Sequence, residues 1–218
     1  MATVSAPAQL AIAEAGPVPV ASKSQWFTDP KLARALVGLA EDLFVDARQR
    51  RIPIRVLEPS AGRGNLVRAV LDRAPRACIV DAVDIDPRWR AGLEAIGDPR
   101  VRVEIADYLT RPAPAQRYTV APCNVPFTDG EEVRHLAKLL DECDRITALL
   151  PVRTMHGRER YEQVWHRFDP RRADRDWYLR QKVHCISRPK FGTAGGMDEI
   201  LLLDLRYRAP GDCIERWL

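Results

Sequence analysis

The sequence lacks the patterns that mark several large classes of protein. Its five cysteines are odd in number, lie far apart and never form a C-x-x-C pair, so neither a disulfide framework nor a zinc site is indicated. The four histidines also lack the spacing of metal ligands, and we expect no metal. No apolar run approaches the ~20 residues that cross a bilayer. The start has no basic region or continuous apolar core of a signal peptide, so we expect a soluble, cytoplasmic protein without a membrane partner.

Two common nucleotide-binding signatures are also missing. Gly62 and Gly64 begin a G-x-G-x-x-G pattern, but Val67 occupies its third glycine position. No G-K-[ST] sequence follows, which excludes a Walker loop. The carboxylate of Glu58 would repel a pyrophosphate at this turn. The turn therefore favours a cationic adenosine ligand without phosphate over NAD or ATP.

Length and composition indicate one folded domain. With 218 residues and 46% hydrophobic content, the chain can bury one substantial core. Residues 1–23 are mostly Ala, Pro, Val and Ser without periodicity, and we expect a mobile tail there. Residues 24–218 are then the single domain. The net charge of +4 is too small to indicate a polyanionic partner by itself.

The folded part is expected to begin with an amphipathic helix of about five turns over residues 28–50. Thr28 or Asp29 can cap its start, and Pro30 suits the first helical position. Apolar side chains recur there at helical spacing: Leu32, Leu36, Leu39 and Leu43.

Strand and helix patterns then alternate through the middle of the chain. The segments are 54–74, 78–96, 101–109, 118–127, 131–142 and 145–151. Such alternation predicts a doubly wound α/β fold with a mostly parallel sheet, helices on both faces, and a ligand crevice at the carboxyl ends of the strands. Two strands without a helix between them, in 177–191 and 198–207, indicate an antiparallel hairpin at one edge.

Four motifs in order resemble those of the class I S-adenosylmethionine-dependent methyltransferases, in particular the amino-methylating branch that modifies adenine. They are "QWFTDP", "EPSAGRGN", the acid that ends "VDAVD", and the acid of "IADYL". The resemblance runs from Trp26 to Leu205. It implies a Rossmann-like sheet of seven strands with an antiparallel last strand, and S-adenosylmethionine as cofactor.

The resemblance also assigns the cofactor-binding residues. The glycines line the methionine part of the cofactor, Asp84 holds the ribose hydroxyls, and Asp107 lies near the adenine amino group. The full implied set is Trp26, Thr28, Glu58, Pro59, Ala61, Gly62, Gly64, Asn65, Asp84, Ile85, Asp107 and Tyr108.

The turn Asn124-Val125-Pro126-Phe127 is similar to the catalytic pattern of the same family. DNA adenine enzymes usually have Pro at the second place and ribosomal RNA adenine dimethyltransferases usually have Leu or Ile, so Val125 departs from the DNA form. The Asn124 side-chain oxygen and the Val125 carbonyl can accept both amino hydrogens of adenine. Pro126 then stiffens the turn and Phe127 stacks on an extruded base.

Cys123, directly before this turn, permits another interpretation. A Pro-Cys pair at a strand end is similar to that of cytosine-5 methyltransferases, in which cysteine attacks the ring. Those enzymes also need an acidic motif after the fifth strand, and here that place reads Leu-Pro-Val at residues 150–152. We therefore interpret Cys123 as a packed strand residue.

Residues 153–190 form a basic insertion that alternates arginine with aromatic residues. Phosphate contact plus base stacking predicts this composition, and so does a solvated surface over a buried aromatic stripe. The candidate nucleic-acid contacts are Arg153, Arg171, Arg172, Arg188 and Lys190. The aromatic residues are Tyr161, Trp165, Phe168, Trp177 and Tyr178. The segment Arg188–Phe191 is similar to a loop of phage and bacterial DNA enzymes.

Taken together, these motifs predict methylation of the amino group of adenine, with DNA preferred over RNA as the nucleic-acid partner. Methylation of ribosomal RNA or of a protein glutamine amide is the nearest alternative, because both use a similar Asn-x-Pro-aromatic turn. A degenerate methyltransferase fold that only binds nucleic acid or a protein partner is the second alternative, and Val125 is the residue that favours it.

Overall fold

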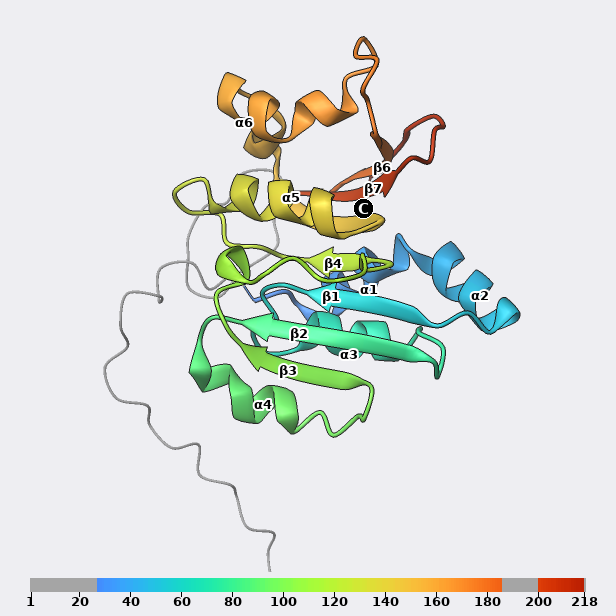
Figure 1. Ribbon diagram of the computed structural model, residues 1–218, viewed down its shortest axis with the longest axis vertical. Coiled ribbons are helices and arrows are strands. Elements are labelled where there is room, and N and C mark those ends of the chain that lie inside the picture. The colour runs from blue at the N-terminus through green and yellow to red at the C-terminus, as the bar shows by residue number, and fades with distance from the viewer. Residues whose placement is uncertain (1–26, 186–199, 218) are drawn as a thin grey trace, which may run out of the picture.

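The computed structural model describes residues 27–185 and 200–217, and its strands form two sheets (Figure 1). The first is parallel and has the order β1-β2-β3, formed by Ile54–Glu58, Cys78–Asp84 and Val101–Ile105. The second has the order β4-β5-β7-β6-β8, formed by Ala121–Cys123, Arg145–Pro151, Ile200–Tyr207, Trp177–His184 and Ile214–Trp217. The tail expected over residues 1–23 lies outside the described residues.

The two sheets meet where β1 runs beside the start of β4. Val56 forms a parallel bridge with Val120, and the backbone N–H of Leu57 donates to the Val120 carbonyl at 3.1 Å. The expected single sheet of seven strands is therefore corrected, because the described residues form a three-stranded and a five-stranded sheet joined by this bridge. Val120 lies one residue before β4 begins, so this link is an isolated bridge and not a strand ladder.

The antiparallel pairing predicted near the carboxyl end is confirmed for β6 and β7. The pair does not lie at the edge of the sheet that we expected, because β5 flanks β7 and β8 flanks β6. The antiparallel strand is β7, which also pairs antiparallel with β5. We expected the antiparallel strand to be the last one. Instead β8 follows it and pairs parallel with β6. The segment 208–213 turns the chain past the start of β6, and the turn includes a positive φ of 46° at Arg208.

Helices connect most of the parallel strands, as the alternating pattern predicts. They are α1 Pro30–Gly38, α2 Glu41–Arg50, α3 Asn65–Leu71, α4 Arg90–Glu94, α5 Glu131–Glu142 and α6 Arg158–Gln163. In Figure 1, α1 and α3 lie behind β1 and β2, whereas α5 lies beside β4 with α6 beyond it. Between β3 and β4 the chain forms only a short 3₁₀ turn, Tyr108–Thr110, and a loop. Helices therefore cover the sheet face less completely than we expected.

The first helical segment begins where we expected but is broken in two. The side chain of Asp29 accepts the backbone N–H of Lys31 at 2.7 Å and caps α1. The break falls at Leu39, whose carbonyl accepts a hydrogen bond from the Arg145 guanidinium instead of from the next turn of helix. Arg145 itself is fixed by two bonds of 2.8 Å to the buried carboxylate of Asp204 on β7. This buried ion pair holds the Arg145 guanidinium against the end of α1.

Candidate active site

The carboxyl ends of the parallel strands bring three separate polar side chains to one edge. Glu58 is the last residue of β1, Asp84 is the last residue of β2, and Asn124 directly follows β4. Asp107 comes two residues after β3. Because β1 lies between β2 and β4, these ends are neighbours in space. Ligands of open α/β sheets bind at such an edge.

The turn after β1 is tied to the end of β2 by its backbone. The N–H of Ala61 donates to the Val83 carbonyl at 2.8 Å, and the N–H of Gly62 donates to a carboxylate oxygen of Asp84 at 2.6 Å. Gly62 and Gly64 have φ angles of +47° and +76°, a region that disfavours other residues. A Cβ on Gly64 would lie 3.0 Å from the side chain of Ile96, so close packing adds to the preference for glycine there.

Glu58 is a buried carboxylate with an unused acceptor. It is 1% exposed, and one oxygen accepts the backbone N–H of Ser60 at 3.1 Å. Its Oε2 atom has no hydrogen-bond partner among the described residues. Burial raises the pKa of this carboxyl well above its ordinary value, and the nearby charge of Asp84 raises it further. A ligand that brings a hydrogen-bond donor and positive charge would relieve this cost.

Asp84 organises the backbone around it. One oxygen holds Gly62, and the other accepts the N–H of Asp86 at 2.8 Å. Burial raises the pKa of Asp84, although these two N–H groups oppose the shift. Ile85 beside it is 61% exposed, which leaves an apolar surface at the same edge. Asp107 is half-buried and caps the following 3₁₀ turn through the N–H of Leu109.

The Asn124–Phe127 turn and the turn that carries Gly62 and Gly64, here called the glycine turn, meet through Thr28. The Asn124 Nδ2 group donates to the hydroxyl of Thr28 at 2.9 Å, and the Asn65 Nδ2 group donates to the Thr28 carbonyl at 2.8 Å. A small hollow lies among the three segments. Its lining is Phe27, Thr28, Ser60, Ala61, Gly62, Arg63, Asn65, Leu66 and Asn124. Five predicted site residues thus share one hollow: Thr28, Ala61, Gly62, Asn65 and Asn124.

The rest of the Asn124–Phe127 turn is anchored in the core. Val125 is 1% and Phe127 6% exposed, so the ring of Phe127 does not present the open stacking surface that we expected. Arg153, a candidate nucleic-acid contact, donates to the Phe127 carbonyl at 3.1 Å. In this structure Arg153 therefore supports the turn through a hydrogen bond to its backbone.

No protein-family model and no curated protein matches the sequence, whereas solved structures match in fold. A Pyrococcus horikoshii protein provisionally named as an RNA methyltransferase aligns over 84% of this chain and 86% of its own, with 16% identity and a TM-score of 0.63. A provisionally named class I S-adenosylmethionine-dependent methyltransferase from Listeria monocytogenes aligns over 84% of this chain and 64% of its own, with 10% identity and a TM-score of 0.63. The 23S rRNA methyltransferase ErmE aligns over 84% of this chain and 70% of its own, with 22% identity and a TM-score of 0.58. The chain has the Rossmann-like methyltransferase fold.

Two residues near the site of this methyltransferase fold point into the core. Tyr108 is 2% exposed and its hydroxyl donates to the buried Glu142 at 3.0 Å, and its place beside the adenine ring of the cofactor stays a prediction. Cys123 is fully buried, and burial raises the pKa of its thiol well above the ordinary value. A thiolate nucleophile is disfavoured there, which supports the packed interpretation of Cys123 over the cytosine-5 alternative.

Four residues that line the hollow were not predicted from the sequence: Phe27, Ser60, Arg63 and Leu66. Phe27 and Arg63 contact each other there. Phe27 covers Gly62, with a ring carbon 3.6 Å from the position of an added Cβ. The Arg63 guanidinium lies 4.2 Å from the centre of the Phe27 ring. Their positions inside "QWFTDP" and "EPSAGRGN" were the available signal. Trp26, the other aromatic of the first motif, lies outside the described residues.

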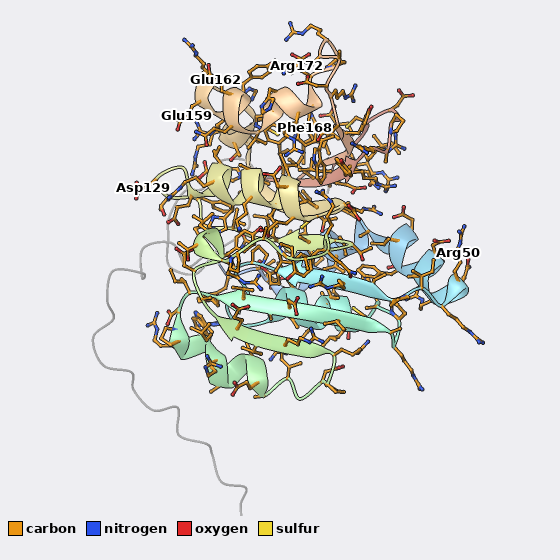
Figure 2. The ribbon with its side chains drawn as sticks, in the orientation of Figure 1. Arg50, Asp129, Glu159, Glu162, Phe168 and Arg172 are labelled. Carbon is orange, nitrogen blue, oxygen red and sulfur yellow. The ribbon has the colours of Figure 1, made fainter. Side chains whose placement is uncertain are left out.

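The basic insertion uses its aromatic residues for packing. Trp177 is fully buried, and the rings of Trp165, Phe168 and Trp177 contact one another in series with centroids 5.2 and 6.1 Å apart. The expectation that they stack on bases is therefore wrong for Trp177, which forms part of the core. Phe168 lies beneath the surface loop that carries Arg172 (Figure 2).

The candidate arginines of the insertion carry intramolecular partners. Arg171 pairs with Asp169 and Arg172 with Asp174, each at 2.7 Å. The side chain of Arg171 is nevertheless 83% exposed. Contact of these arginines with nucleic acid stays a prediction, and it requires exchange of the acidic partner. Arg188 and Lys190 lie outside the described residues.

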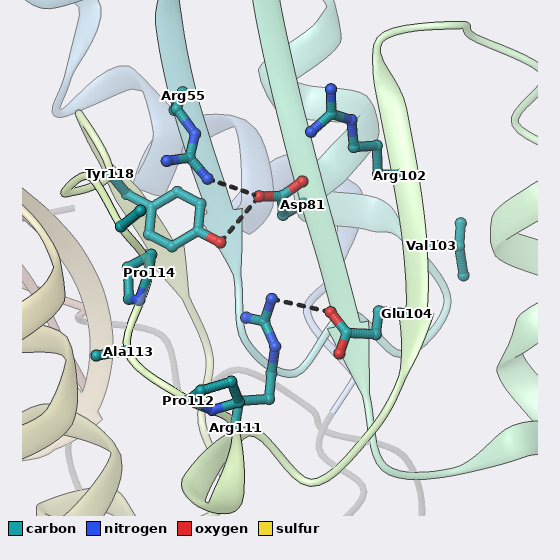
Figure 3. Close-up of a pocket in the computed structure, with 11 residues that line it drawn as sticks. Arg55, Asp81, Arg102, Val103, Glu104, Arg111, Pro112, Ala113, Pro114 and Tyr118 are labelled. Atoms are coloured by element: carbon teal, nitrogen blue, oxygen red, sulfur yellow. Dashed lines mark hydrogen bonds and ion pairs between the residues drawn. The ribbon is translucent and has the colours of Figure 1, made fainter.

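A larger hollow of about 580 Å³ lies away from this site, over β1 to β3 and the loop before β4. Figure 3 shows two ion pairs among its lining residues, Arg55–Asp81 and Arg111–Glu104, together with a third guanidinium, that of Arg102. Asp81 accepts from Arg55 at 3.3 Å and from the Tyr118 hydroxyl at 2.8 Å, and Arg111 pairs with Glu104 at 2.8 Å. None of its lining residues is a predicted site residue.

Within residues 27–185 and 200–217, no helix is both long and apolar enough to span a bilayer. The same residues contain no group of three or more His, Cys, Asp or Glu side chains placed to hold a metal ion.

Proposed function

We propose that the protein transfers a methyl group from S-adenosylmethionine to the exocyclic amino group of adenine in nucleic acid. The meeting of Asn124 with the glycine turn in one hollow carries this proposal. Amino methylation requires a fixed acceptor beside the methyl donor, because the amino group has to be oriented before it can attack. The described fold, shared with methyltransferases, supports the proposal.

The residues present fit this cofactor. The unused Oε2 of Glu58 is suited to the cofactor's ammonium group, which would satisfy a buried acceptor and balance its charge. The Asp84 oxygens each accept one backbone N–H and retain lone pairs for ribose hydroxyls. When bound, the cofactor supplies an electrophilic methyl group whose bond to sulfur breaks with the electron pair remaining on sulfur.

The chain's own residues prepare the attacking nitrogen. The adenine amino lone pair is delocalised into its ring, and hydrogen bonds from both amino hydrogens localise it on nitrogen. Asn124 Oδ1 and the Val125 carbonyl are the acceptors in this proposal, and Pro126 limits how far the turn can move. After the new carbon–nitrogen bond forms, the nitrogen releases one proton to solvent.

DNA is the first candidate substrate, because the Asn124–Phe127 pattern and the Arg188–Phe191 segment resemble those of DNA enzymes. RNA is a second candidate, favoured by two observations. Val125 replaces the proline that DNA enzymes usually have, and two neighbours in fold carry RNA methyltransferase names. The binding-only alternative is opposed by the presence of Glu58, Asp84, Asp107 and Asn124 together.

Mass spectrometry of nucleosides tests these candidates. Purified protein is incubated with methyl-deuterated cofactor and, separately, unmethylated DNA, ribosomal RNA and a glutamine-containing protein extract. Deuterated N6-methyldeoxyadenosine supports DNA, and deuterated N6-methyladenosine or its dimethyl form supports RNA. Label in glutamine, in C5 of cytosine, or in no polymer despite cofactor binding contradicts the proposal. Asn124→Ala is the inactive control, and Asp81→Asn, in the larger hollow, is the matched control.

A further inference from the structure

Thr28 takes part in two hydrogen bonds that join distant segments. Its hydroxyl oxygen accepts from Asn124 Nδ2, 96 positions away, at 2.9 Å. Its carbonyl accepts from Asn65 Nδ2, 37 positions away, at 2.8 Å. Thr28 is 7% and Asn124 8% exposed, so water competes little for these bonds. Through its backbone carbonyl and its side-chain hydroxyl, Thr28 therefore connects Asn65 beside the glycine turn to Asn124 in the Asn124–Phe127 turn.

The two ends of the Asn124 carboxamide have different chemistry. Nδ2 carries two hydrogen-bond donors, whereas Oδ1 only accepts. A substrate amino group is itself a donor, so it needs Oδ1. In this structure Thr28 engages the Nδ2 end. A half-turn of the carboxamide would instead direct the donor end toward an incoming amino group, and two donors would then face each other.

We propose that Thr28 is a positioning residue that holds the Asn124 carboxamide with Oδ1 as the acceptor for the substrate amino group, and that Asn65 holds Thr28 in place. This role rests on the proposed function, because the amino substrate is part of it. Thr28 thus acts on catalysis through Asn124, whatever contacts it also makes with a cofactor.

The surroundings of Thr28 make it a firm support. Threonine is branched at Cβ, which restricts its χ1 rotation. The next residue, Asp29, caps α1 through the backbone N–H groups of Lys31 and Leu32. Asn65 is the first residue of α3 and follows Gly64 in the left-handed region. The two bonding partners of Thr28 are thus fixed by regular structure, because Asn65 begins α3 and Asn124 directly follows β4.

Two substitutions separate the hydroxyl from the shape of the side chain. Thr28→Val keeps the branched shape and removes the acceptor, whereas Thr28→Ser keeps the acceptor. Thr147→Val is the matched control, because Thr147 is fully buried on β5 and its hydroxyl has no hydrogen-bond partner among the described residues. Asn65→Ala tests the hydrogen bond between Asn65 and the Thr28 carbonyl.

The activity measurement uses turnover at saturating substrate and the dissociation constant of S-adenosylhomocysteine from calorimetry. Loss of a buried bond that leaves a donor unpaired lowers turnover of Thr28→Val by roughly 5- to 30-fold. Its dissociation constant changes less than its turnover, and Thr28→Ser stays within about threefold of wild type in both. Asn65→Ala combined with Thr28→Val loses less than the product of the two single effects. Equal losses in the Ser and Val variants would overturn the proposal.

A second measurement does not need a substrate. The side-chain amide signals of Asn124 are assigned in nitrogen-15 NMR spectra by their absence in Asn124→Asp. In wild type we expect slow hydrogen exchange of these amide protons. Thr28→Ser and Thr147→Val should keep the wild-type chemical shifts and exchange rates, whereas Thr28→Val should show shifted signals that exchange faster. Unchanged signals in Thr28→Val would refute the positioning role even if the protein methylates adenine. If the Asn124 amide signals shift in Thr28→Val but the wild type methylates no substrate, the hydrogen bond is established and the proposed function is contradicted.

Discussion

The backbone N–H of Gly62 donates to the carboxylate of Asp84 across 2.6 Å, which ties the glycine turn after β1 to the end of β2. The other carboxylate oxygen holds the N–H of Asp86 at 2.8 Å. Asp84 therefore shapes the turn before any ligand binds. The same carboxylate is the group proposed to bind the ribose hydroxyls, so one side chain links the form of the site to its affinity.

Replacing Asp84 is expected to weaken binding of S-adenosylhomocysteine. Asp84→Ala removes charged hydrogen bonds to a ligand, and such bonds contribute about 1.5–3 kcal/mol each. Calorimetry measures the change directly. Asp81→Ala on the same strand is the control, since Asp81 instead bonds Arg55 and Tyr118 in the larger hollow. Equal weakening by both variants, or binding of NAD by the wild type, would count against the assigned site.

Glu58 is expected to make stability depend on pH. Burial raises its pKa well above the ordinary value of 4.5, so the folded protein holds this proton at pH values where the unfolded chain has lost it. The free energy of unfolding therefore falls as pH rises from about 4.5 toward the raised pKa. Glu58→Gln should flatten that slope in urea unfolding measured across the pH range. An exposed substitution, Glu94→Gln, is the control, and an unchanged slope in Glu58→Gln would show that another group causes it.

Asn124 is expected to affect turnover far more than cofactor affinity. Loss of one preorganised hydrogen-bonding group in an active site lowers the rate on the order of 10²–10³, or about 3–4 kcal/mol. Steady-state kinetics of Asn124→Ala and calorimetry with S-adenosylhomocysteine separate the two effects. Cys123→Ala should retain turnover, because the Cys123 thiol is buried and its pKa is raised. The reverse pattern, with Cys123 essential and Asn124 dispensable, would establish cysteine chemistry.

Phe127 is expected to contribute mainly to stability. Its ring is 6% exposed, and Phe→Ala changes in cores cost about 3–5 kcal/mol. Chemical denaturation of Phe127→Ala measures this loss, with Tyr161→Ala at a partly exposed ring as the comparison. If Phe127→Ala instead keeps its stability and loses nucleic-acid affinity by about 1–3 kcal/mol, the ring stacks on a base.

Arg171 and Arg172 are expected to contact phosphates. Changing both to Ala should reduce the slope of log affinity against log salt by roughly 1–2. Arg50→Ala with Arg90→Ala removes the same charge from exposed i,i+4 ion pairs and should leave the slope unchanged. Figure 2 shows Arg172 and Arg50 at separate edges of the molecule. A salt-independent affinity, or equal slopes for both double variants, would show that Arg171 and Arg172 do not contact phosphates.

Local patterns were sufficient for many elements and for the order of the site. Residues 131–142 and 145–151 form the predicted helix and strand, because their apolar spacing is continuous and turn residues bound them. The acids at the ends of β1 and β2 also occupy the predicted edge. Parallel strands place their carboxyl ends together whatever the details of packing, so this part of the site follows from the sequence pattern.

Contacts between distant segments required the tertiary structure. The break at Leu39 depends on Arg145, the burial of Tyr108 depends on Glu142, and no local spacing contains either pair. The aromatic insertion fits two interpretations by composition alone, and only the packing of Trp177 distinguishes them.

The sequence by itself therefore determined the alternating fold, the glycine turn, and which polar residues end each strand, because these depend on side-chain periodicity and backbone preference over a few residues. The tertiary structure alone decided that Thr28 bonds Asn124 and that Gly62 bonds Asp84. The physical reason is that a hydrogen bond depends on where two atoms lie to within a few tenths of an ångström. Only the packing of the whole chain determines those positions.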